Sequence, residues 1–359
     1  MRNPFKDLPK DAGVLHSSPI VHRYEKNPIL TAKDVSYPAT FVFNAGANFY
    51  HGKYVIAPRI DYYDAERHTP ALLIGTGLGW SEDGIHWQME PEMVRVHYHD
   101  TMLPWVCDAR LTVLEGDLYL TFCFENQHSE RPGIAKWRGF GVDFDAVTVG
   151  IPQQRNMVLF PEKVNGKYMR LERPSNQWGD PFHIWYAFSP DLVYWGEQEL
   201  FLGCEDVPWA SCKIGAGAPP IRTDKGWLLV FHAVDGDPGR TVKVCGGRKW
   251  WKRYTCGAAL FDGDDPTRLI AITKSPLIVA EAPYETGNPE LWTEFTIFPE
   301  GALLDPSDPN TLRIYYGAGD TCTCLATLQL DDLWKVMTPA HRMARRAVVP
   351  WRIEEWDGK

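Results

Sequence analysis

An aspartate lies near the start of an apolar segment in the sequence PWVCDARLTVL. Asp108 follows Val106 and Cys107, so its carboxyl group is expected to be poorly solvated. Desolvation raises the pKa of a carboxyl group toward the range in which it can act as a general acid. Arg110 projects from the same face of a strand two residues later and would oppose that rise. Asp108 is therefore either a proton donor or a structural carboxylate paired with Arg110.

Cationic and amide side chains occur at the ends of other apolar segments. Arg155 and Asn156 precede MVLFP, and together they offer several donors in fixed directions, which suits a tetrahedral oxyanion. Lys213, in CKIGAG, adds a point charge, and its neighbouring glycines leave the backbone open to close approach. Arg59, in VIAPRIDYY, would be costly to bury without an anionic partner. Each cation alone is more typical of a structural or surface residue, but together they predict an anion site.

Further polar side chains are candidates for the same region. His232 in LVFHAV and Tyr254 in RYTCG can donate hydrogen bonds, although a lone histidine in an apolar strand is usually a core residue. Several carboxylates could bind sugar hydroxyl groups or serve as a base, and spacing does not choose among them: Asp61, Glu162, Glu285, Glu300 and Asp320.

The candidates belong to a repeated unit. Five times an apolar strand near a polar residue runs into a turn and a second aromatic-rich strand, in segments that begin at residues 41, 105, 155, 213 and 295. A period of roughly 50 to 85 residues fits a four-stranded propeller blade with loop insertions. Equivalent strand starts in a propeller point toward one central channel. The sequence therefore predicts an all-β, five-bladed β-propeller in which Asn44, Asp108, Arg155, Lys213 and Glu300 converge.

The chain is expected to divide into three parts. Residues 1–40 are irregular and are predicted to pack on the propeller as an extension, residues 41–330 to form the catalytic propeller, and residues 331–359 to form a short C-terminal helix and a tail. Asp331 and Asp332 supply the acidic first turn of that helix. The similar segments SEDGIHW and SPDLVYW are interpreted as tight turns in which Ser and Asp bind local backbone donors.

Composition limits the partners. A formal net charge of −9 argues against a general nucleic-acid surface. No apolar run reaches the length of a membrane-spanning helix and the first residues lack an export signal, so we expect a cytoplasmic protein that contacts no membrane. The eight cysteines form no CxxC pair and are interpreted as small strand hydrophobes. The 15 Trp and 15 Tyr residues can stack on sugars, but each is more typical of packing between blades.

Several segments, taken as a set, resemble glycoside hydrolase family 130, which comprises β-mannoside phosphorylases and related mannosidases. They are NPIL, FNAGA, CDARL, RNMVLFPEKVNGKYMRLERP, SPDLVYWG, KIGAGAPPI, GWLLVFHAV and YYGAGDT, spread over about residues 20–335. The resemblance implies a five-bladed propeller and an inverting reaction, in which inorganic phosphate attacks the anomeric carbon of a β-mannoside and releases α-mannose 1-phosphate. Phosphate is then a co-substrate, and no metal or organic cofactor is expected.

The resemblance also implies individual roles. Asp108 matches the family's proton donor, which is thought to act through a mannose hydroxyl group. The phosphate site corresponds to Arg59, Arg155, Asn156, Lys213, His232 and Tyr254. Asn44 and Asp320 fall in motifs that line the sugar site, and Asp61 and Glu285 are the carboxylates that we add to the predicted substrate contacts.

Some segments depart from the family pattern. Ala109 replaces the proline that commonly follows the donor, and GNPELWTEFTIFPEGA carries the unusual residues Trp292, Glu294 and Glu300. The insertion TVKVCGGRKWWKRY is a further difference. Trp250 and Trp251 of this insertion could stack on a sugar or only pack. Because the segment with Trp292 can border the acceptor pocket, the leaving sugar and the linkage stay open.

Two alternatives to a phosphorylase remain at this point. A β-mannosidase of the same fold would use water, and it would be expected to lose the cations and gain carboxylates. Retention of Arg155, Asn156 and Lys213 favours phosphate as the nucleophile. A non-catalytic sugar-binding propeller is the second alternative, since one fold hosts many functions. The expected partners are a small carbohydrate and phosphate, with homo-oligomerisation left open.

Overall fold

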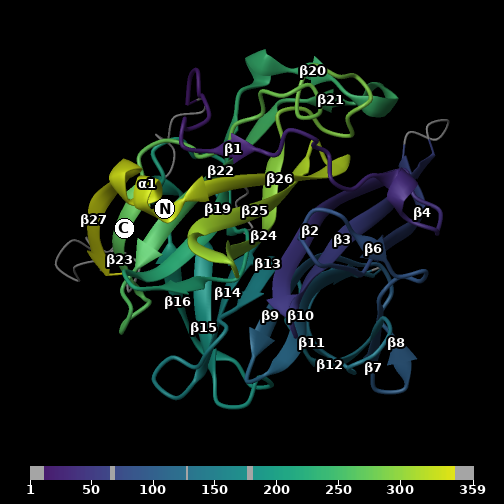
Figure 1. Cartoon of the computed structure of the whole chain (residues 1–359), viewed down its shortest axis with the longest axis horizontal. Helices are drawn as coiled ribbons and strands as arrows, with labels where there is room; N and C mark the ends of the chain where they lie inside the picture. Colours follow the sequence, from purple (N-terminus) through teal and green to yellow (C-terminus); the bar gives the residue numbers. More distant parts are fainter. Residues whose placement is uncertain (1–11, 65–68, 127, 176–180, 344–359) are drawn as a thin grey trace, which may run out of the picture.

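The computed structural model describes residues 12–64, 69–126, 128–175 and 181–343, and most of its strands form five radial sheets (Figure 1). Each sheet is one blade of a five-bladed β-propeller, which confirms the predicted fold class. The five sequence segments that predicted the repeat are the first and second long strands of the five blades. The polar residues near their starts are therefore brought to one end of a common axis.

The blades follow one another along the chain. The first contains β2 (Phe41–Tyr50), β3 (Lys53–Asp64), β4 (Thr69–Thr76), β5 (Gly79–Ser81) and β6 (Gln88–Met89). The second contains β7 (Arg95–Tyr98), β8 (Thr101–Met102), β9 (Val106–Leu114), β10 (Asp117–Glu125), β11 (Glu130–Trp137) and β12 (Asp143–Val149). The third contains β13 (Gln154–Leu159), β14 (Tyr168–Pro174), β15 (Ile184–Ser189) and β16 (Gly196–Leu202).

The last two blades use strands from both end regions of the chain. The fourth contains β17 (Lys213–Ala216), β18 (Ile221–Thr223), β19 (Gly226–Gly236), β22 (Lys252–Phe261), β23 (Arg268–Thr273) and β27 (Met337–Met343). The fifth contains β24 (Ile297–Asp305), β25 (Asp308–Ala318), β26 (Cys322–Gln329) and β1 (His22–Arg23). A small hairpin, β20 (Val242–Lys243) and β21 (Lys249–Trp250), projects from the fourth blade (Figure 1).

Both end segments contribute strands to the propeller, whereas the predicted division placed them outside it. Strand β1 lies within the segment 1–40 and pairs with β26 as the outermost strand of the fifth blade. The predicted helix is α1 (Leu330–Val336), and the chain then continues into β27, which pairs with β23. The predicted tail beyond Met343 lies outside the described residues. Both ends of the described chain therefore add strands to blades built by distant residues.

Apolar packing between neighbouring blades stabilises the ring. Five of the buried hydrophobic clusters each join two adjacent blades. Because a blade is covered on both faces, its strands are continuously apolar rather than alternating, as in β19, which is buried along its whole length. Large aromatic side chains such as Trp227 and Tyr315 belong to this packing. The packing interpretation of many aromatic residues is thus confirmed.

The two similar turn segments behave as predicted. Asp83 Oδ1 accepts hydrogen bonds from the backbone N–H groups of Ile85 (2.8 Å) and His86 (2.9 Å). Asp191 Oδ1 accepts equivalent bonds from the two residues 193 and 194, both at 2.9 Å. These carboxylates therefore stabilise turns.

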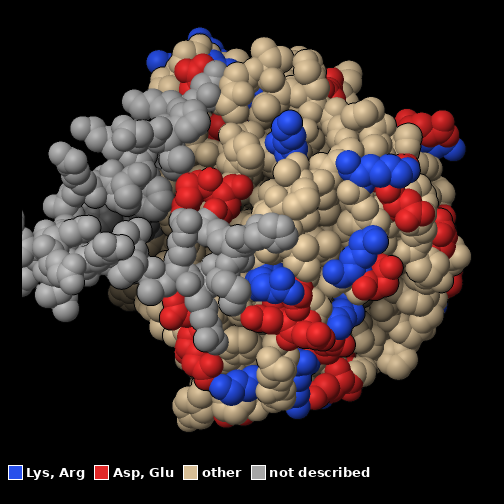
Figure 2. All heavy atoms as spheres, turned by 90° about the vertical axis from the view of Figure 1, so that its left-hand side faces the viewer, with Lys and Arg blue, Asp and Glu red and all other residues tan. Residues whose placement is uncertain are grey.

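The remaining predictions from composition concern cysteines and the surface. All eight cysteines are free, and seven of them are buried. No helix within the described part of the chain has the length and hydrophobicity required to cross a bilayer. Figure 2 shows Lys and Arg side chains interspersed with Asp and Glu on the face that it displays. Mixed charge on that face differs from the basic stripe that a nucleic-acid backbone requires.

Candidate active site

A polar cavity of about 140 Å³ opens where the starts of the inner strands meet, and all five blades contribute to it. Eight of the predicted site residues line it: Asn44, Arg59, Asp108, Arg155, Asn156, Lys213, Tyr254 and Asp320. Three more lining residues were not predicted: Arg173, Thr296 and Phe298. The fold therefore brings most of the predicted site residues together in one cavity.

Local backbone geometry directs three polar side chains into the cavity. Asn44, Asp108 and Asn156 have φ values of 46°, 51° and 54°, in the left-handed region. Each lies where the pairing register of its inner strand shifts, which marks a β-bulge. A bulge redirects a side chain, and Asn and Asp adopt the left-handed region more readily than most residues. The residue types are thus suited to these strand positions.

Asp108 is surrounded by guanidinium groups. Arg59 Nη1 lies 3.1 Å from Asp108 Oδ1, and Arg155 Nη1 lies 3.7 Å from Asp108 Oδ2. Burial alone would raise the pKa of Asp108, but the positive charges of Arg59, Arg155 and Arg110 outweigh it and lower that pKa to about 2. The expectation of a raised pKa is therefore wrong for the free protein, because the opposing cations are closer than the sequence indicated.

Arg155 contacts carboxylates from more than one element. Its Nη2 forms an ion pair with Glu125, and its Nε lies 3.7 Å from Glu130 Oε1. Both glutamates belong to the second blade, at the end of β10 and the start of β11. Burial alone would lower the pKa of Arg155, but the negative charges of Asp108 and Glu125 outweigh burial and raise that pKa. Arg155 therefore stays charged at the cavity.

Arg173 is the principal site residue that the sequence reasoning missed. It lies on β14 directly opposite Arg155 in the antiparallel ladder. Burial lowers the pKa of Arg173 to about 10, and its Nε has no hydrogen-bond partner among the described residues. Two arginines facing each other repel, which an anion between them would relieve. The hairpin pairing of RNMVLFPEKVNGKYMRLERP was the available signal, since Arg173 lies as far from the turn on one strand as Arg155 on the other.

His232 lies behind the cavity wall rather than in it. Its ring stacks on Phe298 with centroids 4.4 Å apart, and Arg173 Nη1 lies 3.5 Å from its Nε2. Burial and the nearby charges of Arg173 and Lys213 lower its pKa well below the usual value, so the imidazole is neutral. A Cβ atom at Gly215 would lie 2.4 Å from this ring. The glycine that was expected to admit a ligand thus makes room for His232.

Two carboxylates that were predicted to bind substrate have structural positions instead. Asp61 does not line the cavity, and its oxygens accept hydrogen bonds from Arg59 Nε (2.8 Å) and Nη2 (3.0 Å). Glu285 is fully buried away from the cavity and accepts hydrogen bonds from Arg23 Nε and Tyr316 Oη, both at 2.8 Å. Asp61 therefore orients Arg59, and Glu285 anchors the N-terminal segment.

Asp320 is the second carboxylate of the cavity. It follows β25 and accepts a hydrogen bond of 3.1 Å from Thr293 Oγ1. Burial raises its pKa to about 6. Lys213 lies on the neighbouring fourth blade, with its Nζ 5.1 Å from the ring centre of Tyr254. The cavity thus combines four cations with two carboxylates of different proton affinity.

Several buried polar atoms around the cavity lack a hydrogen-bond partner within the described residues. They are Asn44 Oδ1, Asn156 Oδ1, Arg173 Nε and His232 Nδ1. Unpaired buried polar groups are rare in folded proteins and commonly mark a site that binds a polar ligand. Their concentration near one cavity indicates that a polar molecule belongs there.

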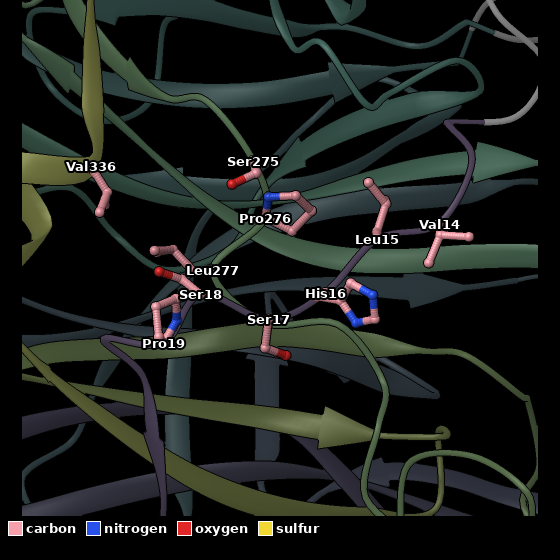
Figure 3. A pocket seen from close by; sticks show the side chains of 10 residues that line it. All are labelled: Val14, Leu15, His16, Ser17, Ser18, Pro19, Ser275, Pro276, Leu277 and Val336. Carbon is pink, nitrogen blue, oxygen red and sulfur yellow. The ribbon is translucent and has the colours of Figure 1, made fainter.

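A second cavity, of about 380 Å³, is larger but has different chemistry (Figure 3). It lies between the N-terminal segment and the loop before Leu277, and none of its ten lining residues is Asp, Glu, Lys or Arg. Its polar side chains are three serines and His16. The larger volume therefore does not identify the functional site. Of these two cavities, the smaller one is lined by charged side chains.

The side chains that line the smaller cavity are suited to a tetrahedral anion and to a hydroxyl-rich ligand. Guanidinium groups bind such an anion through several directed hydrogen bonds, while amide and carboxylate groups bind hydroxyl groups. No three His, Cys, Asp or Glu side chains gather as metal ligands in the described part of the chain. The cavity thus offers cationic donors for an oxyanion next to carboxylate and amide groups for hydroxyl groups.

Comparison with known proteins agrees with this chemistry. Residues 15–339 match the family model described as β-1,4-mannooligosaccharide phosphorylase. An enzyme of that name from Ruminococcus albus is 30% identical over 345 residues, which cover 92% of this chain and 93% of the relative. The β-1,2-mannobiose phosphorylase of Listeria innocua is 25% identical, with 87% of this chain and 97% of the relative covered.

The fold also matches a solved structure. The complex of the Listeria innocua β-1,2-mannobiose phosphorylase with β-1,2-mannobiose has a TM-score of 0.71 and 23% identity, with 88% of this chain and 98% of that chain covered. At this level of identity the match shows a common fold.

Proposed function

The chain belongs to glycoside hydrolase family 130, and from this we infer that it catalyses the inverting phosphorolysis of β-mannosides. Inorganic phosphate is the nucleophile, and α-mannose 1-phosphate is the product. The observation that carries this function is the convergence of Arg59, Arg155, Arg173 and Lys213 on the cavity that contains Asp108. A glycosidase that activates water needs a carboxylate base, whereas phosphate needs cations that hold it in line.

The reaction exchanges one bond at the anomeric carbon for another. A phosphate oxygen forms a bond to C1 as the bond from C1 to the glycosidic oxygen breaks, and the leaving sugar takes a proton. Asp108 supplies this proton, through a mannose hydroxyl group as the family resemblance implies. Asn44 and Asp320 bind the mannosyl unit. The cations orient phosphate and offset the charge that develops as it attacks.

Bound phosphate also raises the pKa of the proton donor, Asp108. In the free protein the carboxylate of Asp108 pairs with Arg59 and Arg155, which keeps it ionised. A bound phosphate dianion shares these guanidinium groups and adds negative charge beside Asp108. Both effects raise the pKa of Asp108, since nearby negative charge disfavours a second anion. Binding of the nucleophile therefore favours the protonated form of the donor.

The direct test is an assay of the purified protein with β-1,4- and β-1,2-linked mannobiose, with and without phosphate. We expect α-mannose 1-phosphate to form only with phosphate. In the synthetic direction, α-mannose 1-phosphate is offered with glucose, N-acetylglucosamine, mannose or mannobiose, and analysis of the product gives the linkage. Release of mannose at equal rates with and without phosphate would identify a hydrolase and contradict the proposal.

The proposal also covers the co-substrate, the cellular compartment and the oligomeric state. Phosphate is a co-substrate, and we expect phosphorolysis to persist after treatment with a metal chelator. The eight free cysteines agree with a reducing compartment such as the cytoplasm. Light scattering after size exclusion tests whether the protein forms a homo-oligomer.

A further inference from the structure

A buried carboxylate near the cavity has no role in the proposed reaction. Glu300 belongs to β24, the inner strand of the fifth blade, at a shift in register with β25. Its side chain is fully buried and does not line the cavity. Glu300 Oε1 lies 2.9 Å from Arg110 Nη2, although this contact lacks the alignment of a hydrogen bond. Its ion pair is therefore with Arg110.

Arg110 joins three blades at the propeller axis. Its guanidinium is 1% exposed, and its Nη1 donates a hydrogen bond of 2.7 Å to the carbonyl oxygen of Asp108. Its Nε donates another, of 3.0 Å, to the carbonyl oxygen of Gly217 beyond β17. With Glu300 on the fifth blade, these contacts fix the guanidinium in position. The bond to the Asp108 carbonyl supports the left-handed backbone at that residue, where φ is 51°.

The same contacts keep the Arg110 guanidinium away from the carboxylate of Asp108, two residues earlier in the sequence. The Asp108 carboxylate forms ion pairs with Arg59 and Arg155, whereas the ion pair of Arg110 is with Glu300. A buried guanidinium that lost Glu300 would have the Asp108 carboxylate as a neighbouring anion. A third direct cation on Asp108 would stabilise its ionised form and oppose proton donation.

We propose that Glu300 is a positioning residue for the proton donor: it holds Arg110 on the backbone carbonyl of Asp108 and away from the Asp108 carboxylate. The inference depends on the proposed role of Asp108 as donor. Around Glu300 the charged groups are Arg110, Asp108, Arg59 and Asp320, and burial raises the pKa of Glu300 well above its usual value. The positive charge of Arg110 opposes this rise, which is the attraction that holds the guanidinium beside Glu300.

Three variants distinguish a positioning role of Glu300 from an effect of its charge and from a general loss of protein stability. Glu300→Leu keeps the approximate volume but removes the partner of Arg110. Glu300→Gln keeps an oxygen that can accept from Arg110. Glu294→Gln is the matched control, because Glu294 is a buried carboxylate of the same segment that binds Thr286 Oγ1 (2.6 Å) and does not line the cavity.

The first measurement is the pH profile of phosphorolysis, together with the Kd for inorganic phosphate from calorimetry. We expect Glu300→Leu to lower kcat by about 10- to 100-fold, a fraction of the effect of a general acid. We also expect its basic limb to move about one unit toward lower pH, since one direct cation shifts a carboxyl pKa by that order. The Kd should stay unchanged, and Glu300→Gln should retain the kcat of the wild type.

The second measurement follows ionisation of Asp108 without turnover, from the ¹³C carboxyl resonance that Asp108→Asn removes. Its pKa should be lower in Glu300→Leu than in the wild type or in Glu294→Gln. Equal pKa values and unchanged pH profiles would overturn the inference, as would loss of activity in Glu300→Gln equal to that in Glu300→Leu. Failure of the wild type to form mannose 1-phosphate would contradict the proposed function instead, while the titration would still decide the position of Arg110.

Discussion

At the scale of single residues, the main feature is that Asp108 has two kinds of cationic neighbour. Arg59 and Arg155 contact its carboxylate, while Arg110 binds its backbone carbonyl. The first two also line the cavity where phosphate is proposed to bind. Occupancy of the proposed anion site is therefore expected to change the ionisation of Asp108.

Asp108→Asn should lower kcat/KM for phosphorolysis by about 10²- to 10⁴-fold, the range that general acid catalysis contributes. The amide cannot donate the proton that the leaving sugar needs, yet it preserves the shape of the cavity. Calorimetry should therefore show that mannobiose still binds. A variant with the turnover of the wild type would remove Asp108 from its proposed role.

Phosphate binding should be accompanied by proton uptake. The pKa of Asp108 is about 2 in the free protein, so its carboxyl group is ionised at pH 7, and a bound dianion raises that pKa. Phosphate affinity should thus increase as the pH falls toward the raised pKa. Calorimetry in buffers of different ionisation enthalpy counts the protons. Asp108→Asn is the control, and equal uptake in both proteins would show that Asp108 does not take up the proton.

Arg173→Ala should raise the KM for phosphate by about 10- to 100-fold, because a hydrogen bond to a charged group contributes roughly 1.5–3 kcal/mol. Arg173 lines the cavity and has an unpaired buried Nε within the described residues. Arg95→Ala is a suitable control, since Arg95 pairs with Asp143 outside the cavity at 2.7 Å. An unchanged KM for phosphate in Arg173→Ala would contradict this assignment.

At the scale of elements, bulges in the inner strands determine where polar side chains point. Asn44, Asp108 and Asn156 occupy bulges in the first three blades, whereas the ladder between β17 and β19 has no register shift at Lys213. The shorter Asn and Asp side chains thus depend on altered backbone geometry, while the long lysine reaches the cavity from a regular strand. Neighbouring strands must leave room for each bulge.

Gly317→Ala tests this requirement. A Cβ atom at Gly317 would lie 2.0 Å from Asn44 Oδ1 and 2.8 Å from the Asn44 backbone nitrogen, so Asn44 must move. We expect kcat/KM for the mannoside to fall by about 10-fold, corresponding to one lost hydrogen bond of roughly 1–1.5 kcal/mol. Gly196→Ala is the control, because a Cβ atom there meets nothing within 4 Å. Equal rates in both variants would show that Asn44 does not depend on this space.

At the scale of the whole molecule, the N-terminal segment completes the ring. Strand β1 pairs with β26, and Arg23 donates hydrogen bonds to the fully buried Glu285 at 2.8 and 3.0 Å. The closing contact therefore joins residues more than 250 positions apart along the chain. Because the site is assembled from all five blades, its geometry depends on this closure.

Arg23→Ala should lower the free energy of unfolding by about 3 kcal/mol, since removing one partner of a buried ion pair leaves an uncompensated charge. Chemical denaturation followed by tryptophan fluorescence measures the change. The folded variant should retain phosphate-dependent activity. Lys335→Ala, which removes the exposed pair with Asp332, should leave stability unchanged. Equal stability of the two variants would contradict the role of Arg23 in closure.

The sequence by itself determined the repeat, the five blades and most of the site, because the same strand pattern recurs and places polar residues at equivalent positions. Asp108, Arg155 and Lys213 were predictable from position and residue type. The position of Arg173 could be inferred only from the pairing of β13 with β14. Glu285 was wrongly included because it is a carboxylate like the site residues, although it is buried elsewhere. Only the tertiary structure decided the ionisation of Asp108 and the partner of Arg110. Both depend on distances between charges from different blades, and a linear sequence does not contain those distances.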